Sequence, residues 1–228
     1  MTTIDEALDA FLAEQEARLA ERTFRNYVDV IEMFRECMNG YGCDSLSELE
    51  RRRWQQAFDA GDKRAFTRLF GPEKIPEQVG QFLDWFVIRK VMAGQEFLEA
   101  CGTVTKKLGK WLAAHGYVGV AAAAEMTERG AEAGVELPKA EQVGELLYEE
   151  TRPVPAFDPD AIPDDDWIED QLWIERVEPG VLWFDGGIGP VEVPKKASDL
   201  ARPGWAVTIT LAKIADAWRI IEVGNVYP

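Results

Sequence analysis

Four polar residues near the middle of the chain recur at helical spacing and could together bind phosphate groups. They are Thr103, Lys106, Lys107 and Lys110, which stand at positions i, i+3, i+4 and i+7. A helix places such positions on one face. Ammonium groups attract phosphate, and a hydroxyl can donate a hydrogen bond to it. This set is either a nucleic-acid contact or an ordinary solvated helix face, and no acidic residue stands between its members.

The opposite face of the same predicted helix is apolar. Its members are Val104, Leu108, Trp111 and Leu112. Gly102 and Gly116 flank the segment and predict where the helix begins and ends. The helix closes the apolar stretch 81–117. We therefore expect one face of it in the core of a helical domain and the lysines in solvent.

The last part of the chain is rich in tryptophan, a residue that can form an aromatic docking surface. Its members are Trp167, Trp173, Trp183, Trp205 and Trp218. Alternation along strands predicts that most of them pack in a core. A small barrel can bury only a few indoles, so one or two could instead line an exposed groove that binds a peptide.

Residues that could carry out catalysis are not grouped in this sequence. The single histidine, His115, follows a helix and is expected to cap its C-terminal end. Arg51, Arg52 and Arg53 interleave with acidic residues and are expected on a solvated face. The Gly186–Gly189 run joins two strands and is interpreted as a turn. With no nucleophile–base pair and no metal-ligand spacing, we expect no enzyme, no metal and no cofactor.

The charge balance limits the possible partners. The formal net charge is −16, with 18 Lys+Arg against 27 Asp+Glu in residues 1–150 and 7 against 14 in residues 151–228. Both parts are acidic, which opposes non-specific binding to nucleic acids and to anionic membranes. The three cysteines form no CxxC pair, and neither a secretory leader nor a membrane span is recognisable. These features predict a cytoplasmic protein.

Residues 1–150 have the apolar spacing of helices. Helices are expected over approximately 3–20, 23–39, 45–60, 63–70, 76–92, 96–100, 103–115, 120–134 and 139–149. Thr3 with Glu6 and Ser45 with Glu48 have the form of capping boxes. The two last helices would cap the domain or bridge to the next one.

Residues 151–166 contain four prolines and five aspartates and are expected to form an acidic linker. Its aspartates lack the spacing of a calcium loop. From Trp167 the apolar period changes to two, and five strands are expected over 167–177, 181–184, 189–193, 206–214 and 217–226. We therefore predict an α+β protein with an all-α bundle and a five-stranded antiparallel β-barrel, SH3-like in preference to OB-like, over 167–228.

Three segments of the first part resemble the core-binding, SAM-like domain of tyrosine recombinases and phage integrases. They are Ile4 to Leu12, Thr23-Phe24-Arg25-Asn26-Tyr27 with Ile31 and Phe34, and Thr103 to Tyr117. The resemblance covers about residues 1–118, and its motifs are mostly hydrophobic spacing. It implies a helical domain that contacts DNA.

Carried over to this sequence, the DNA-facing positions of that family are Thr23, Arg25 and Asn26 on one helix and the lysine-bearing set on the other. Asp29, Glu32 and Glu36 share the exposed face of Arg25 and would repel phosphate. The catalytic residues of recombinases, including their His-x-x-Arg motif, are missing.

Two functions are therefore expected. The first is a non-catalytic adaptor that binds DNA through Thr103, Lys106, Lys107, Lys110, Arg25 and Asn26. The alternative is a protein–protein interaction module without a nucleic-acid role. Its docking residues would be Trp167, Trp173, Trp183 and Trp205.

Overall fold

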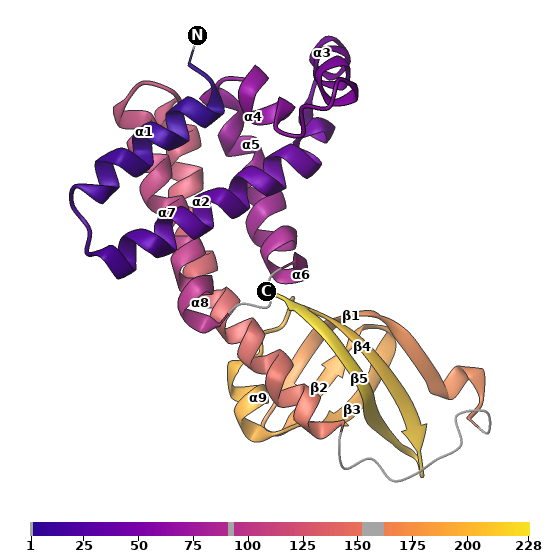
Figure 1. The fold of residues 1–228 in the computed structure, drawn as a ribbon. Helices are drawn as coiled ribbons and strands as arrows, with labels where there is room; N and C mark the ends of the chain where they lie inside the picture. The colour runs from indigo at the N-terminus through magenta and orange to yellow at the C-terminus, as the bar shows by residue number, and fades with distance from the viewer. Residues whose placement is uncertain (1, 91–93, 152–161) are drawn as a thin grey trace. The chain divides into compact units, whose positions relative to one another are not determined.

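A computed structural model describes residues 2–90, 94–151 and 162–228 of the chain (Figure 1). The chain forms two compact units, Met1–Val135 and Glu136–Pro228, and each is described by itself. The first unit is helical and the second contains a β-barrel. The predicted α+β, two-part architecture is therefore confirmed.

The helical unit contains seven α-helices and the first part of an eighth among its described residues. They are α1 (Ile4–Glu16), α2 (Glu21–Tyr41), α3 (Glu48–Asp59), α4 (Ala65–Leu69), α5 (Ile75–Gly80), α6 (Val87–Lys90), α7 (Gln95–Ala114) and α8 (Val120–Glu150). A π-helical segment, η3 (Gln81–Phe86), joins α5 to α6, and short 3₁₀ turns precede α3 and α5.

Capping explains where two of these helices begin. The Thr3 hydroxyl accepts from the Glu6 N–H, and the Glu6 carboxylate accepts from the Thr3 N–H, as predicted. The prediction that Ser45 and Glu48 form the second capping box was wrong. The box consists of Ser47 and Glu50, because Ser45 lies in the preceding 3₁₀ turn.

Aromatic side chains from separate elements meet in the core of the helical unit. Phe34 of α2 and Phe82 of η3 pack at a tilt, with ring centroids 4.7 Å apart. Phe11 of α1 meets Trp111 of α7 in an edge contact at 5.7 Å. These contacts join α1, α2, η3 and α7 around one core.

The prediction that Gly102 begins the helix was wrong, because α7 starts at Gln95 and passes through Gly102 without a break. The expectation of two separate helices over 120–149 was also wrong, because α8 is one helix with Pro138 inside it. Its last part packs with the barrel through Ala140, Val143 and Leu147. The expected helical domain ended at residue 150, whereas the compact helical unit ends at Val135.

The second unit contains a closed five-stranded barrel. Its strands are β1 (Trp167–Glu178), β2 (Val181–Phe184), β3 (Ile188–Glu192), β4 (Ala206–Ile214) and β5 (Ala217–Tyr227). All five lie within two residues of the predicted ranges. Between β3 and β4 lies α9 (Lys195–Leu200).

The barrel is mixed, not purely antiparallel. Its strand order is β1-β2-β3-β5-β4, and β3 pairs with β5 in parallel through Val191 and Trp218. A closed ring with an odd number of strands must contain at least one parallel pair, so the predicted all-antiparallel closure could not form. This order, with a helix between β3 and β4, is the OB-like alternative and not the preferred SH3-like one.

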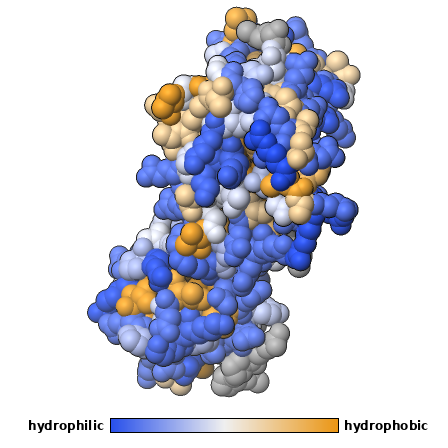
Figure 2. Space-filling model, turned by 90° about the vertical axis from the view of Figure 1, so that its left-hand side faces the viewer, coloured by the Kyte–Doolittle hydropathy of each residue, from blue (hydrophilic) through white to orange (hydrophobic). Residues whose placement is uncertain are grey.

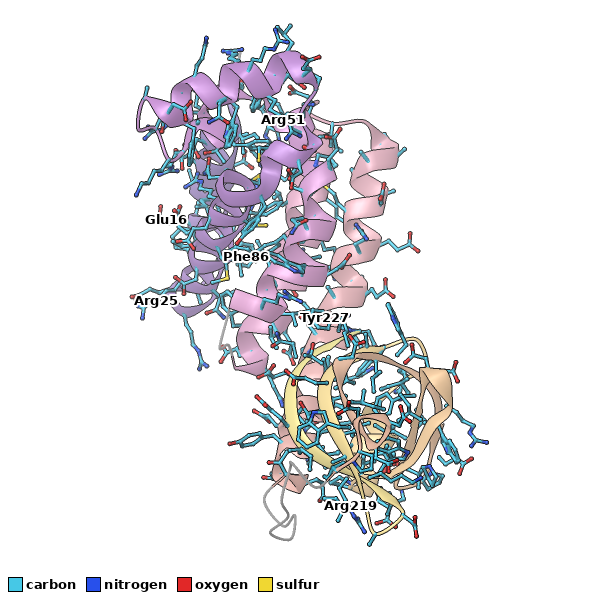
Figure 3. The ribbon with its side chains drawn as sticks, turned by 90° about the vertical axis from the view of Figure 1, so that its right-hand side faces the viewer. Glu16, Arg25, Arg51, Phe86, Arg219 and Tyr227 are labelled. Atoms are coloured by element: carbon cyan, nitrogen blue, oxygen red, sulfur yellow. The ribbon has the colours of Figure 1, made fainter. Side chains whose placement is uncertain are left out.

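Alternating side chains fill the barrel, which Figure 3 shows nearly end on. Leu172, Ile174, Leu182 and Phe184 point inward and are buried. Of the predicted linker, residues 152–161 lie outside the described part of the chain. Asp164–Asp166 form a 3₁₀ turn before β1. No described helix is long and apolar enough to cross a membrane.

Candidate nucleic-acid interface

Helix α7 positions the predicted phosphate-binding set, which we call the lysine face: Thr103, Lys106, Lys107 and Lys110. Val104, Leu108 and Leu112 are buried on the opposite side of the helix. Thr103, Lys107 and Lys110 are exposed, and Lys106 is partly exposed. The helical period and the buried apolar stripe together fix this orientation. The structure therefore brings these four residues together in solvent as expected.

The three lysines of this face form no ion pair with any residue that the structure describes. Most arginines elsewhere do: Arg25 pairs with Glu21 at 2.8 Å, and Arg52 pairs with Glu48. A cation that pairs with a carboxylate of the same protein attracts an external anion less strongly. The lysine face thus presents three charges that remain available to an anion.

The lysine face is placed by an unusually close contact between α7 and α8, which run side by side in Figure 1. A Cβ atom built on Gly102 would lie 2.3 Å from the backbone nitrogen of Gly134. One built on Gly130 would lie 2.7 Å from the backbone nitrogen of Lys106. Only glycine permits this approach. Lys106 therefore lies at the line of contact between the two helices.

The flank of α8 beside the lysines carries mainly small side chains, with the exposed Glu128 one turn from Ala124 and from Ala131. Arg129 of α8 lies beside Gly80 and pairs with Asp84. These contacts place Arg129 on the flank of α8 that faces away from the lysines. Both helices are right-handed, and they run antiparallel. On each helix, residues that lie about 100° after the contact line in the direction of the chain therefore project to the same side of the helix pair. On α8 these residues are Val120, Ala124, Thr127 and Ala131, of which all but Thr127 are exposed. Small side chains therefore border the lysines.

Two acidic residues border the N-terminal end of the lysine face. Glu99 is exposed one turn before Thr103. Glu96, one turn earlier, pairs with Arg22 of α2 at 2.6 Å. The positive charge is therefore concentrated in the second half of α7, around Lys106, Lys107 and Lys110.

The predicted contribution of α2 is weaker. Arg25 is exposed, and Figure 3 shows it projecting from the edge of the helical unit, but Glu21 neutralises it. Asn26 is partly exposed. Asp29, Glu32 and Glu36 follow Arg25 at i+4, i+7 and i+11, and all three are exposed. This surface of α2 is acidic overall, as the sequence indicated. Arg51, at another end of the same unit in Figure 3, pairs with Asp44.

The four tryptophans predicted to bind a partner have different environments. Trp205 is 5% exposed and belongs to the barrel core. Trp167 and Trp183 are partly exposed, and the Arg176 guanidinium covers the Trp183 ring at 4.2 Å. Trp173 is 52% exposed. The structure therefore presents only Trp173 openly to solvent among these four.

A pocket of about 410 Å³ in the helical unit was not anticipated from the sequence. Its lining includes Glu73, Glu77, Tyr117 and Glu125, and none of the predicted site residues. Three carboxylates and no basic side chain line it, so it is unsuited to an anion such as phosphate. Glu73 and Glu77 come from the turn before α5 and from α5 itself, whereas Glu125 and Tyr117 come from a part of the chain about 40 residues later. Spacing alone could not have grouped them.

His115 has the capping position expected from the sequence. Its Nδ1 lies 2.9 Å from the Trp111 carbonyl oxygen, and its Nε2 lies 3.0 Å from Glu14. Neither contact involves a nucleophile. Among the described residues, no group of three or more His, Cys, Asp or Glu side chains could hold a metal ion.

Figure 2 shows a mostly hydrophilic surface on one side of the molecule, with a hydrophobic patch on the barrel unit. Comparison with known proteins gave no match to a family model, to a curated protein or to a solved structure.

Proposed function

We propose that this protein is a non-catalytic adaptor that binds the phosphate backbone of DNA through the lysine face of α7. One observation carries the proposal: three neighbouring lysines are accessible on one face and form no ion pair within the described structure. The exposed ammonium groups of these lysines do not contribute to the packing of the core. An external anion would give these charges a partner.

The length of the lysine face fits a short run of phosphates. Thr103 and Lys110 are seven residues apart, which corresponds to about 10 Å along a helix. A DNA strand carries one phosphate for about 3.4 Å of duplex axis, so the face spans about three phosphates. Lys106, Lys107 and Lys110 would neutralise them, and the Thr103 hydroxyl could donate a hydrogen bond.

The composition of the face favours binding without sequence recognition. Base reading in the major groove uses arginine or lysine on guanine and asparagine or glutamine on adenine, and single-strand binding uses exposed aromatic rings. The lysine face and the α8 flank beside it contain no arginine, asparagine, glutamine or aromatic ring. Each lysine carries a point charge on a flexible stem, which suits a phosphate better than the fixed edge of a base. We therefore expect weak, salt-dependent binding to duplex DNA, with a dissociation constant in the range of about 10⁻⁴ to 10⁻⁶ M that is typical of non-specific contacts.

The resemblance of residues 1–118 to the core-binding domain of tyrosine recombinases supports the same proposal, because that domain contacts DNA. The lack of recombinase catalytic residues is the reason for proposing an adaptor and not an enzyme. Three free cysteines, Cys37, Cys43 and Cys101, support a cytoplasmic location.

Fluorescence anisotropy with a labelled duplex of 20 base pairs tests the proposal. At about 20 mM salt, the combined Lys106→Ala, Lys107→Ala and Lys110→Ala variant should bind at least tenfold more weakly than the wild type. The combined Arg51→Ala, Arg52→Ala and Arg53→Ala variant removes the same charge from α3, which has no buried residue. It should bind within about threefold of the wild type. Equal losses in both variants would refute a specific role for the lysine face.

A further inference from the structure

Trp173 projects from the outer surface of the barrel, and its cross-strand partner on β4 is small. Leu172 and Ile174 on either side are buried, so strand alternation turns Trp173 outward. Its cross-strand partner on β4 is Ala206, whose side chain is too small to cover an indole. The ring is therefore 52% exposed. Other barrel tryptophans are covered to a greater extent.

Two carboxylates without an ion-pair partner among the described residues lie close to Trp173. The Asp185 carboxylate accepts a hydrogen bond of 2.9 Å from the Trp173 backbone N–H. Glu175, two residues after Trp173 on β1, is exposed. Neither forms an ion pair with a described residue. The nearby Arg176 is already engaged, because it pairs with Glu178 at 3.2 Å and lies over Trp183.

The charge of the whole unit indicates the sign of its partner. Residues 136–228 contain 19 Asp+Glu and 8 Lys+Arg, which gives a formal charge of −11. Barrels with this strand order include oligonucleotide-binding proteins. A charge of −11 opposes phosphate and attracts cations. The surface around Trp173 therefore fits a basic partner and not a nucleic acid.

We infer that the outer surface around Trp173, Glu175 and Asp185 is a docking site for an extended, basic segment of a partner protein. An arginine or lysine of the segment would lie over the exposed indole, where the ring attracts a cation. The two carboxylates would pair with it or with its neighbour. Outward residues of β1 repeat every second position, as do those of an extended peptide. This inference does not depend on DNA binding by α7.

A peptide titration tests the inference. The probe is an end-blocked peptide of 12 residues with alternating arginine and serine, and the control peptide replaces each arginine by the uncharged isostere citrulline. The readout is the indole N–H resonance of Trp173, identified by its loss in a Trp173→Phe variant. The arginine peptide should shift this resonance in a saturable way, and the citrulline peptide should not.

Two carboxylate variants separate a local site from a general charge effect. Glu175→Gln should weaken binding of the arginine peptide about two- to fivefold. Glu222→Gln removes the same charge from an exposed position on β5 and should leave binding unchanged. Both variants alter exposed side chains, so both should fold. Equal effects of the two variants, a response to citrulline, or no shift at Trp173 would each overturn the inference.

Discussion

Gly102 of α7 and Gly130 of α8 meet backbone to backbone: a Cβ atom built on Gly102 would lie 2.4 Å from the carbonyl oxygen of Gly130. Gly109 extends the contact, since its Cβ would lie 2.9 Å from the Cβ of Met126. Two helices this close cannot rotate or slide without steric clashes. The contact therefore fixes the direction in which Lys106 and its neighbours point.

Replacing Gly102 by alanine should destabilise the helical unit. Both neighbouring groups are backbone atoms that cannot move aside, so we expect a loss of at least about 1–3 kcal/mol in the free energy of unfolding. Urea unfolding followed by circular dichroism measures it. Gly40→Ala is the matched control, because a Cβ there meets nothing within 4 Å and alanine favours a helix. A Gly102→Ala variant as stable as Gly40→Ala would contradict the close contact.

Arg35 should be the most sensitive basic residue of α2. It is 6% exposed, its guanidinium pairs with Asp9 and Glu32, and it donates to the Asp5 carbonyl oxygen at 3.1 Å. Arg35→Met should cost about 3 kcal/mol in the free energy of unfolding, at the low end for a buried ion pair. Of its three carboxylate partners, Asp9 and Glu32 stay in water, and the largely buried Asp5 keeps Arg64 as a partner at 2.9 Å. Arg25→Met on the same helix should change it by less than about 0.5 kcal/mol. Similar values for the two variants would refute this difference.

The capping box of α3 should make stability depend on pH. Hydrogen bonds from the Ser47 hydroxyl and backbone N–H, together with Lys74, lower the pKa of Glu50 to about 2. Because the folded pKa lies below the unfolded value of about 4.3, the ionised group stabilises the fold above that value. The contribution is lost as the pH falls from about 5 to about 2.

A Glu50→Gln variant should therefore be less stable than the wild type at pH 7, and the difference should shrink towards pH 2. Urea unfolding at a series of pH values measures it. In a Ser47→Ala background, which lacks the hydroxyl donor, Glu50→Gln should lower the free energy of unfolding at pH 7 by a smaller amount. A difference that stays constant with pH would show that Glu50 is not held in its ionised form.

The cysteines should differ in reactivity. Burial raises the pKa of Cys37 and of Cys101 to about 12, and both side chains are enclosed. Cys43 is partly exposed, although burial also raises its pKa. Maleimide at pH 8 should label one thiol in the native protein and three in urea, as counted by intact mass. Rapid native labelling of Cys101 would contradict its position inside the helical core.

The sequence was informative wherever a local rule determines the structure. Strand alternation located all five strands, and the i, i+3, i+4 pattern placed Lys107 and Lys110 opposite Leu108. Thr3 and Glu6 identified the first helix start correctly. These features depend on residues within one turn or one strand of each other.

Features that depend on distant partners were missed. Gly102 was interpreted as a helix boundary, but its role depends on Gly130 and Gly134 of another helix. The seven-residue spacing of Gly102 and Gly109, and the four-residue spacing of Gly130 and Gly134, could have indicated two helix faces in close contact. Pro138 suggested a break that α8 does not have. The exposure of Trp173 depends on its small cross-strand partner Ala206, and the burial of Trp205 depends on the barrel core around it, neither of which composition reveals.

The salt dependence of duplex binding tests the central claim most directly. Three neutralised phosphates predict a slope of about −2.7 for the logarithm of the association constant against the logarithm of salt concentration. Lys107→Ala should reduce the magnitude of this slope by about 0.9. A slope near zero, or one that Lys107→Ala leaves unchanged, would show that the lysine face does not bind DNA.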